Sequence, residues 1–207
     1  MRPLAREPSS ARDERALHAV RPDGAHDVEP GVIVALGTGS VAASLASDGE
    51  FRMASGYGFP SGDEASGAWL GLRLIVHAQQ ALDGRVPVDD LVHALLEHTG
   101  AQDRDSLVVW LCAANQTAYA RLAPIAIEHR GHPFAARLLG WAGLEVGKMI
   151  AALDTTGTLP VALCGGLGAP LRGYVPQAYQ GRLREPRADS AHGGLQLARR
   201  EAQRLAG

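Results

Sequence analysis

Three runs of apolar residues at strand spacing follow one another directly after Gly31. They occupy residues 32–36, 41–46 and 50–54. Gly37-Thr38-Gly39-Ser40 separates the first two runs, and Asp48-Gly49, a dipeptide typical of tight hairpins, precedes the third. The pattern therefore predicts an antiparallel meander of three strands.

Apolar residues recur at helical spacing through the middle of the chain. A long helix is expected from Ala65 to Leu82, with Asp83-Gly84 as its stop signal. Pro124 is expected to break a further helical stretch, because proline cannot donate its backbone hydrogen bond. The other expected helices lie at residues 88–98, 106–113, 116–130 and 134–153. We interpret the leucines and aromatics on these helices as core.

A second strand-like region comes late in the chain. Residues 160–164 are apolar and are followed at once by Gly165-Gly166 and an expected helix. A loop is then expected at 182–190 and an alanine-rich helix at 191–205, with Gly193-Gly194 near its start. By contrast, charges and prolines interrupt any apolar period in residues 1–29, which are expected to be poorly structured. The remainder, 30–207, is predicted to be one α/β domain.

Composition narrows the class of protein. The 207 residues carry a formal net charge of −2, so nothing indicates a nucleic-acid partner. Cys112 and Cys164 are far apart in apolar contexts, which does not suit a disulfide framework or a metal site and favours a reducing cytoplasm. No apolar run approaches the ~18 residues of a membrane span, and no membrane partner is expected.

The segment Gly37–Ser40, called here the first glycine turn, is the first candidate for binding chemistry. Consecutive backbone N–H groups in a tight turn form a concavity for anions, and glycine lets phosphate oxygens come close. Thr38 and Ser40 add hydroxyl donors. The alternative is an ordinary hairpin connection.

The central glycine loop, Gly56–Glu64, leads into the long helix. Ser61 and Glu64 have the spacing of a capping box, so Glu64 has a structural explanation as the alternative to a catalytic role. Asp63 is not explained in this way. A carboxylate between glycine-rich segments can accept hydrogen bonds from a polyol or orient a hydrated cation.

The glycine pair, Gly165–Gly166, is the third candidate. Bare backbone after a strand and before a helix lets a flat ring or a sugar-phosphate lie against it. Tight packing between strand and helix is the alternative reading of the same residues.

Taken together, these motifs resemble the C-terminal lobe of the N-acetylglucosamine kinase and BadF/BadG/BcrA/BcrD ATPase group of the actin, Hsp70 and sugar kinase superfamily. VALGTGS resembles its second phosphate motif, GYGFPSGDEASGAWLGLRL its sugar-side block and LCGGLGAP its adenosine motif. PRADSAHGGLQLARR is similar to the closing segment of the family. Among subfamilies, the sequence looks most similar to bacterial glucosamine kinases.

The resemblance implies a ribonuclease H-like lobe of the actin-like ATPase fold, with transfer of the γ-phosphoryl group of ATP to the 6-hydroxyl of glucosamine or N-acetylglucosamine in the presence of Mg²⁺. It further implies the following roles: Gly37, Thr38, Gly39 and Ser40 hold the phosphates; Gly56, Tyr57, Gly58 and Asp63 line the sugar pocket; Gly165 and Gly166 flank the adenosine.

The sequence also departs from the family pattern. Tyr57 stands where the family usually has Trp, and Ala65 where it has Gly. Family members carry an N-terminal lobe that contains the general base, whereas about thirty residues precede Gly31 here; Asp13 does not match that base, and the catalytic residue stays unassigned. The expected partner is an N-terminal lobe or a second copy in a homodimer. A binding module or remnant without catalysis remains the alternative function.

Overall fold

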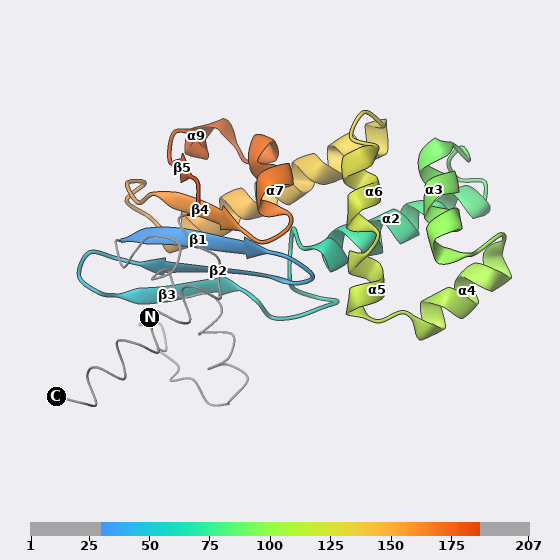
Figure 1. Ribbon diagram of the computed structural model, residues 1–207, viewed down its shortest axis with the longest axis horizontal. Coiled ribbons are helices and arrows are strands. Elements are labelled where there is room, and N and C mark those ends of the chain that lie inside the picture. Colours follow the sequence, from blue (N-terminus) through green and yellow to red (C-terminus); the bar gives the residue numbers. More distant parts are fainter. Residues whose placement is uncertain (1–29, 187–207) are drawn as a thin grey trace.

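The structure is a computed structural model that describes residues 30–186. Its centre is a five-stranded mixed sheet with the strand order β3-β2-β1-β4-β5 (Figure 1). Strands β1, β2 and β3 form an antiparallel meander, while β4 and β5 run parallel to β1. The strands are β1 (Gly31–Leu36), β2 (Ser40–Leu45), β3 (Phe51–Ser55), β4 (Val161–Cys164) and β5 (Leu183–Arg184).

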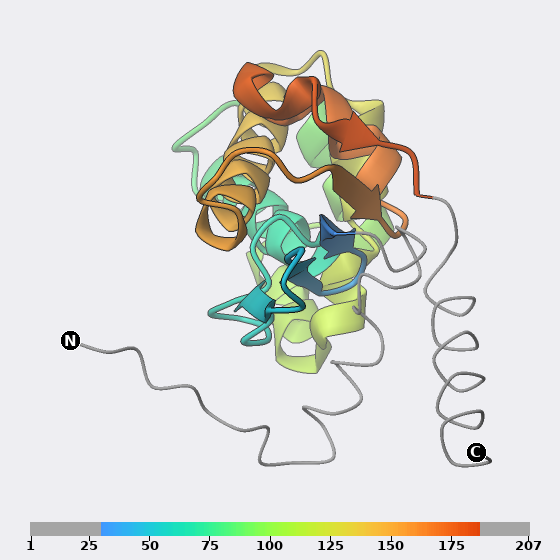
Figure 2. The ribbon, with the colours of Figure 1, turned by 90° about the vertical axis from the view of Figure 1, so that its left-hand side faces the viewer.

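Helices cover one face of the sheet and extend beyond one of its ends (Figures 1 and 2). The longest helix, α7 (Pro133–Leu153), packs across β1, β2 and β3. The group of helices beyond the sheet comprises α2 (Gly67–Leu82), α3 (Asp90–Thr99), α4 (Arg104–Ala113), α5 (Gln116–Ala120) and α6 (Ala123–Glu128). Short helices α8 (Gly168–Leu171), η1 (Arg172–Tyr174) and α9 (Gln177–Gln180) connect β4 to β5.

The main core lies between the sheet and these helices. In β1, alternate side chains point to the two faces of the sheet. Val32, Val34 and Leu36 are fully buried in the main core, whereas Ile33 packs with Ala162 on the other face. The apolar run that identified β1 in the sequence thus reflects a central strand whose side chains are buried on both sides of the sheet.

The predicted meander is confirmed, with each strand shifted by at most one residue from the expected bounds. Gly49, with a φ of 86°, forms the turn before β3. Of the expected helices, all those between residues 65 and 153 are present, and Pro124 lies at the start of α6, where the stretch divides. The α/β class is therefore confirmed.

Two local expectations are wrong. The N-cap of α2 is Ser66, whose hydroxyl accepts a hydrogen bond from Trp69 N at 3.1 Å, so Ser61 and Glu64 do not form its capping box. The sequence also predicted only a loop where β5 forms, because a two-residue strand is too short to show a period. The expectations for 1–29, the helix at 191–205, Gly193-Gly194 and Asp13 lie outside the described residues.

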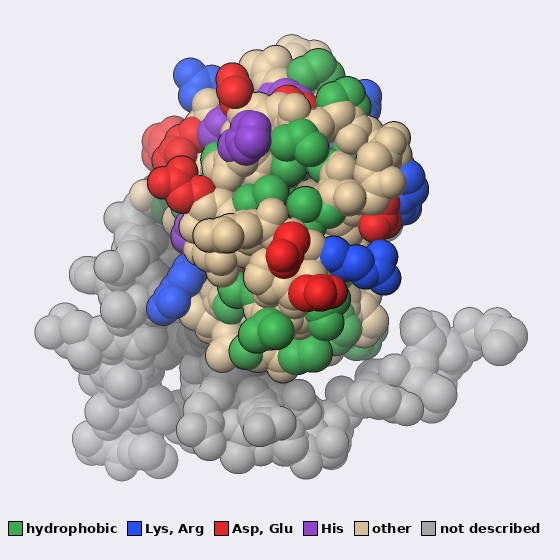
Figure 3. All heavy atoms as spheres, turned by 90° about the vertical axis from the view of Figure 1, so that its right-hand side faces the viewer, with side chains coloured by type: hydrophobic (Ala, Val, Ile, Leu, Met, Phe, Trp, Pro, Cys, Tyr) green, Lys and Arg blue, Asp and Glu red, His purple; other side chains and the backbone are tan. Residues whose placement is uncertain are grey.

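The surface at the helical end carries charges of both signs interspersed with apolar side chains (Figure 3). This distribution agrees with the small net charge and shows no field of one sign on that face. Within residues 30–186, no helix combines the length and the apolar character needed to cross a membrane.

Candidate functional site

The first glycine turn and the glycine pair lie side by side because β1 and β4 are parallel neighbours. Their carboxyl ends meet at the same edge of the sheet, with Ala35 opposite Cys164. Leu167 N donates to Leu36 O at 3.1 Å and ties the two connections together. Ligands of α/β proteins bind at this kind of edge.

The backbone of the first glycine turn is oriented by helix α2. Gly37 O accepts from Gly67 N at 2.8 Å, and Thr38 O accepts from Ala68 N at 3.2 Å. These carbonyls therefore face the helix. Within the described residues, the N–H groups of Thr38 and Gly39 donate to no acceptor. Two adjacent backbone donors are thus available to an anion.

The two hydroxyls of the turn differ in their surroundings. Ser40 is buried and donates its hydroxyl hydrogen to Glu64 O at 2.6 Å. Thr38 is exposed. Thr38 is consequently the hydroxyl of the turn that a ligand can reach directly.

Left-handed backbone conformations concentrate in and beside the central glycine loop. Ser55, Asp63 and Ala65 all have positive φ, at 62°, 57° and 65°, and they are the non-glycine residues of this kind among residues 30–186. Each costs roughly 1–2 kcal/mol for a residue with a Cβ. Such conformations persist where the surroundings enforce them, frequently at functional sites. Ala65 in this conformation also accounts for the glycine that the family usually carries there.

Asp63 connects the central glycine loop to the first glycine turn. Its carboxylate is almost fully buried and accepts hydrogen bonds from Gly58 N at 3.1 Å and from Gln116 Nε2 at 2.9 Å. A Cβ on Gly39 would lie 2.5 Å from Asp63 Oδ2. The missing side chain of Gly39 therefore makes room for this carboxylate. A carboxylate offers about four lone-pair positions, so further hydrogen bonds can be accepted.

The central glycine loop also carries an exposed aromatic side chain. Tyr57 is 90% exposed and stands between Gly56 and Gly58, both with positive φ. The loop is closed by a hydrogen bond from Gly62 N to Gly58 O at 2.8 Å. An exposed tyrosine on a hydrogen-bonded loop offers a ring face to a flat ligand.

Glu64 has a different role from the one expected. Its carboxylate accepts a hydrogen bond from Ser55 Oγ at 2.7 Å, while its carbonyl accepts the hydroxyl of Ser40. Glu64 thus fastens the end of β3 to the start of β2 and helps to hold the site together.

The glycine pair contains one confined and one open residue. Gly165 has a φ of 82°, and a Cβ there would collide with Leu36 O, whereas a Cβ on Gly166 would meet nothing. Just before the pair, burial raises the pKa of the Cys164 thiol to about 11. The thiol is therefore protonated at neutral pH.

Gln116 was not identified from the sequence. It lies at the first position of α5, 53 residues away from Asp63 along the chain. Asn115 is the N-cap of α5, and asparagine is typical of that position, but no local pattern points from Gln116 to Asp63.

Metal-binding groups are sparse. The described residues include no group of three His, Cys, Asp or Glu side chains arranged to hold a metal ion. Asp63 and Glu64 are the carboxylates of the central glycine loop, and both already accept hydrogen bonds. A resident metal site is not supported by this part of the chain.

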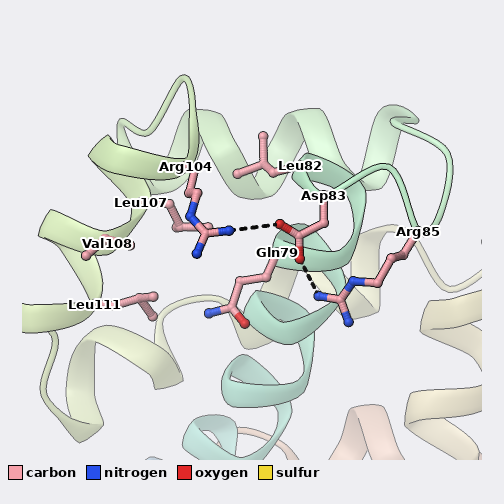
Figure 4. Close-up of a pocket in the computed structure, with 8 residues that line it drawn as sticks. All are labelled: Gln79, Leu82, Asp83, Arg85, Arg104, Leu107, Val108 and Leu111. Atoms are coloured by element: carbon pink, nitrogen blue, oxygen red, sulfur yellow. Dashed lines mark hydrogen bonds and ion pairs between the residues drawn. The ribbon is translucent and has the colours of Figure 1, made fainter.

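A separate cavity of about 230 Å³ lies at the other end of α2, against α4 (Figure 4). Arg85 and Arg104 both point to Asp83, with N–O distances of 2.6 Å and 3.4 Å. The charged groups in this cavity are thus paired with one another. The lining consists of Gln79, Leu82, Asp83, Arg85, Arg104, Leu107, Val108 and Leu111. The edge with the two glycine connections, where backbone donors are unpaired, is the better candidate site.

Comparison with known proteins shows which kinases the chain is similar to. Over 177 residues the chain is 31% identical to glucosamine kinase GspK of Vibrio cholerae serotype O1, covering 84% of this chain and 60% of GspK. A crystal structure from Chromobacterium violaceum, named as an N-acetylglucosamine kinase, matches with 47% identity and a TM-score of 0.81, covering 84% of this chain and 61% of that one. No family model matches the chain.

A further structure, named as an N-acetylglucosamine kinase of Porphyromonas gingivalis, is 22% identical with a TM-score of 0.64 and shows the fold alone. It covers 84% of this chain and 62% of that one. The chain spans about three fifths of the length of these relatives. The resemblance to hexosamine kinases and the mixed α/β fold are thereby confirmed.

Proposed function

We propose that this homologue of glucosamine and N-acetylglucosamine kinases forms one side of a site in which ATP phosphorylates the 6-hydroxyl of an amino sugar. Residues 30–207 correspond in this proposal to the C-terminal lobe, and an N-terminal lobe completes the site. The 31% identity with a glucosamine kinase and the 47% identity with a structure named as an N-acetylglucosamine kinase support a hexosamine as substrate.

The observation that carries the proposal is the contact between Asp63 and Gly39. It brings the loop proposed for the sugar against the turn proposed for the phosphates. A kinase must hold the acceptor hydroxyl next to the transferred phosphoryl group, because this reaction depends mainly on positioning and charge stabilisation. A direct contact between the two binding segments meets this requirement.

Each segment then has a defined task. The unpaired N–H groups of Thr38 and Gly39, with the hydroxyl of Thr38, donate to phosphate oxygens. The space beside Gly37 admits those oxygens, and the open backbone at Gly166 lies next to the adenosine. Asp63 accepts hydrogen bonds from sugar hydroxyls. Tyr57 covers the sugar ring.

ATP supplies the transferred phosphoryl group when bound, and Mg²⁺ neutralises its charge. In this proposal the magnesium ion is held chiefly by the phosphates and water. No carboxylate of the described residues is assigned as the general base. The base is proposed to come from the N-terminal lobe.

A coupled assay of ADP release tests the activity. The purified chain, alone and with a separately supplied N-terminal lobe of a relative, is assayed with glucosamine, with N-acetylglucosamine and without sugar. We expect sugar-dependent ADP release when the N-terminal lobe is supplied and little from the chain alone. We expect Asp63→Asn to reduce this release at least tenfold through lost sugar binding. ADP release that is the same with and without sugar would contradict the kinase assignment.

A binding module without catalysis is the second candidate. It is favoured by the lack of an assigned general base among residues 30–186, beside a well-formed pair of binding segments. Titration calorimetry with ATP and with each sugar separates the two: binding without turnover in every combination would support the module.

A further inference from the structure

Asp63 is held by one partner from its own loop and by one from a distant helix. Gly58 N belongs to the central glycine loop, whereas Gln116 Nε2 belongs to α5. The hydrogen bond from Gly58 joins two residues of the same loop, so by itself it does not fix where the carboxylate lies relative to the first glycine turn. The hydrogen bond from Gln116 fixes the carboxylate relative to helix α5.

The orientation of the Gln116 amide follows from its partner. An ionised carboxylate only accepts hydrogen bonds, so the amide must present its nitrogen to Asp63. The second N–H and the amide oxygen of Gln116 remain free to bind other groups. Because Gln116 is only partly buried, they can reach solvent or a ligand.

Helix α5 is itself firmly located. Asn115 caps it through a hydrogen bond from Ala118 N at 3.0 Å. Its Tyr119 carbonyl packs against Gly71 of α2, where any Cβ would collide with it. Since α2 also binds the carbonyls of the first glycine turn, α5 and the turn are attached to the same helix.

Gln116 also approaches the turn directly. A Cβ on Gly39 would lie 3.3 Å from Gln116 Nε2 and 2.5 Å from Asp63 Oδ2. The hydrogen bond between the two side chains therefore lies against the first glycine turn. We propose that Gln116 is a positioning residue, which fixes the Asp63 carboxylate between the sugar-binding loop and the phosphate-binding turn. The assignment of the ligands in this statement rests on the proposed function.

Three variants test the proposal in the full chain. Gln116→Leu removes the donor and keeps the size of the side chain. Gln116→Glu places a second carboxyl within hydrogen-bond distance of Asp63. The control, Gln79→Leu, makes the same change at a partly buried glutamine of α2 whose side chain has no hydrogen bond within the described residues.

The first measurement needs no ligand. Amide hydrogen exchange at Gly58 reports whether Asp63 still accepts its N–H. We expect exchange at Gly58 to become about tenfold faster in Gln116→Leu and to stay unchanged in Gln79→Leu. Without the donor on Oδ2 the Asp63 carboxylate can rotate about its side-chain bonds, so that Oδ1 no longer stays at Gly58 N, and a lost charge-assisted hydrogen bond is worth at least that factor. Unchanged exchange at Gly58 in Gln116→Leu would overturn the proposal, whatever the chain binds.

The second measurement is N-acetylglucosamine affinity by calorimetry at pH 7.5 and pH 5, because this sugar carries no group that titrates between these values. Gln116→Leu should weaken binding about tenfold at both values. Gln116→Glu should bind poorly at pH 7.5, where two carboxylates repel, and recover towards wild type at pH 5, where they share a proton and restore a donor to Asp63. A purely structural contribution predicts no such recovery, so equal binding by Gln116→Glu at both pH values would also overturn it.

Failure of the proposed function gives a different result. If the wild-type chain binds neither sugar nor ATP while Gly58 exchange responds to Gln116→Leu, the ligand assignment is wrong and the positioning contact stands.

Discussion

The first glycine turn and the glycine pair each contain two glycines, and in each only one of the two is confined by packing. Gly39 is confined by the carboxylate of Asp63, and Gly165 by the carbonyl of Leu36. Gly37 and Gly166 have almost no neighbour where a Cβ would stand. In sequence the four residues look equivalent.

The difference between the two confining groups is that one is a side chain and the other is backbone. The Asp63 side chain can be displaced only by breaking its hydrogen bonds from Gly58 and Gln116, and it belongs to the loop proposed to bind the sugar. Leu36 O lies at the end of a buried central strand and cannot move without the sheet. The first glycine turn is thus coupled to a neighbouring binding segment, whereas the glycine pair is fastened to the fold. Changes at the two places should therefore have different consequences.

The largest effect is expected for Gly165→Ala. The new Cβ would collide with Leu36 O, and the φ of 82° is unfavourable for alanine. Strain and overpacking together should lower the free energy of unfolding by about 3 kcal/mol, measured by urea denaturation. Gly166→Ala is the matched control and should change it by less than about 0.5 kcal/mol. Equal losses in both variants would refute the distinction between the confined and the open glycine.

The next expected effect concerns Cys164, at the end of β4. With its pKa raised by burial to about 11, about one thiol in a thousand is ionised at pH 8. Cys112 is exposed. Alkylation with iodoacetamide at pH 8, followed by mass spectrometry, should therefore modify Cys112 long before Cys164. Comparable rates at both cysteines would show that the strand before the glycine pair is more open than the structure indicates.

Gly39→Ala should have a smaller effect on stability than Gly165→Ala, because the Asp63 side chain can be displaced by breaking its hydrogen bonds. We expect a loss of about 2 kcal/mol together with weaker glucosamine binding. The same change in an Asp63→Gly background, which keeps the positive φ and removes the carboxylate, should cost clearly less. The difference in stability loss between the two backgrounds measures the interaction energy between Gly39 and Asp63. A difference near zero would mean that Asp63 does not confine Gly39.

Gly37→Ala should have the smallest effect on folding, within about 0.5 kcal/mol, since the only atom near the new Cβ is Gly39 O at 4.0 Å. Its effect should instead appear in ATP affinity, which we expect to fall about tenfold because a methyl group occupies the path of the phosphate oxygens. Calorimetry checks this, and ATP affinity equal to that of wild type would argue against phosphate binding at this turn.

The sequence predicted the sheet meander and the main helices because their signals are local. Val32, Val34 and Leu36 alternate within one strand, and Asp48-Gly49 sets a tight turn. The N-cap of α2 was misplaced because two serines, Ser61 and Ser66, precede the helix, and only the folded path of the loop decides between them.

The candidate site could be predicted as separate segments but not as an assembly. From the sequence, the glycines at 37, 39, 165 and 166 were predicted to expose backbone to a ligand. At two of them the space for a Cβ is occupied, by Asp63 at Gly39 and by Leu36 at Gly165. Both contacts join residues far apart in the sequence and form only in the folded chain. The hydrogen bond from Gln116 joins residues 53 positions apart and has no periodic or spacing signal at all.

Helix α2 has one end at the first glycine turn and the other at the cavity lined by Asp83 and Arg104 (Figures 1 and 4). Its 16 residues form a rod of about 24 Å, and an α-helix of this length moves as one body. A rotation of only 5° about one end displaces the other by about 2 Å, enough to break a hydrogen bond such as that from Gly67 N to Gly37 O. Helix α2 is therefore the element that joins the first glycine turn to the side-chain contacts of Asp83 and Arg104 at its other end.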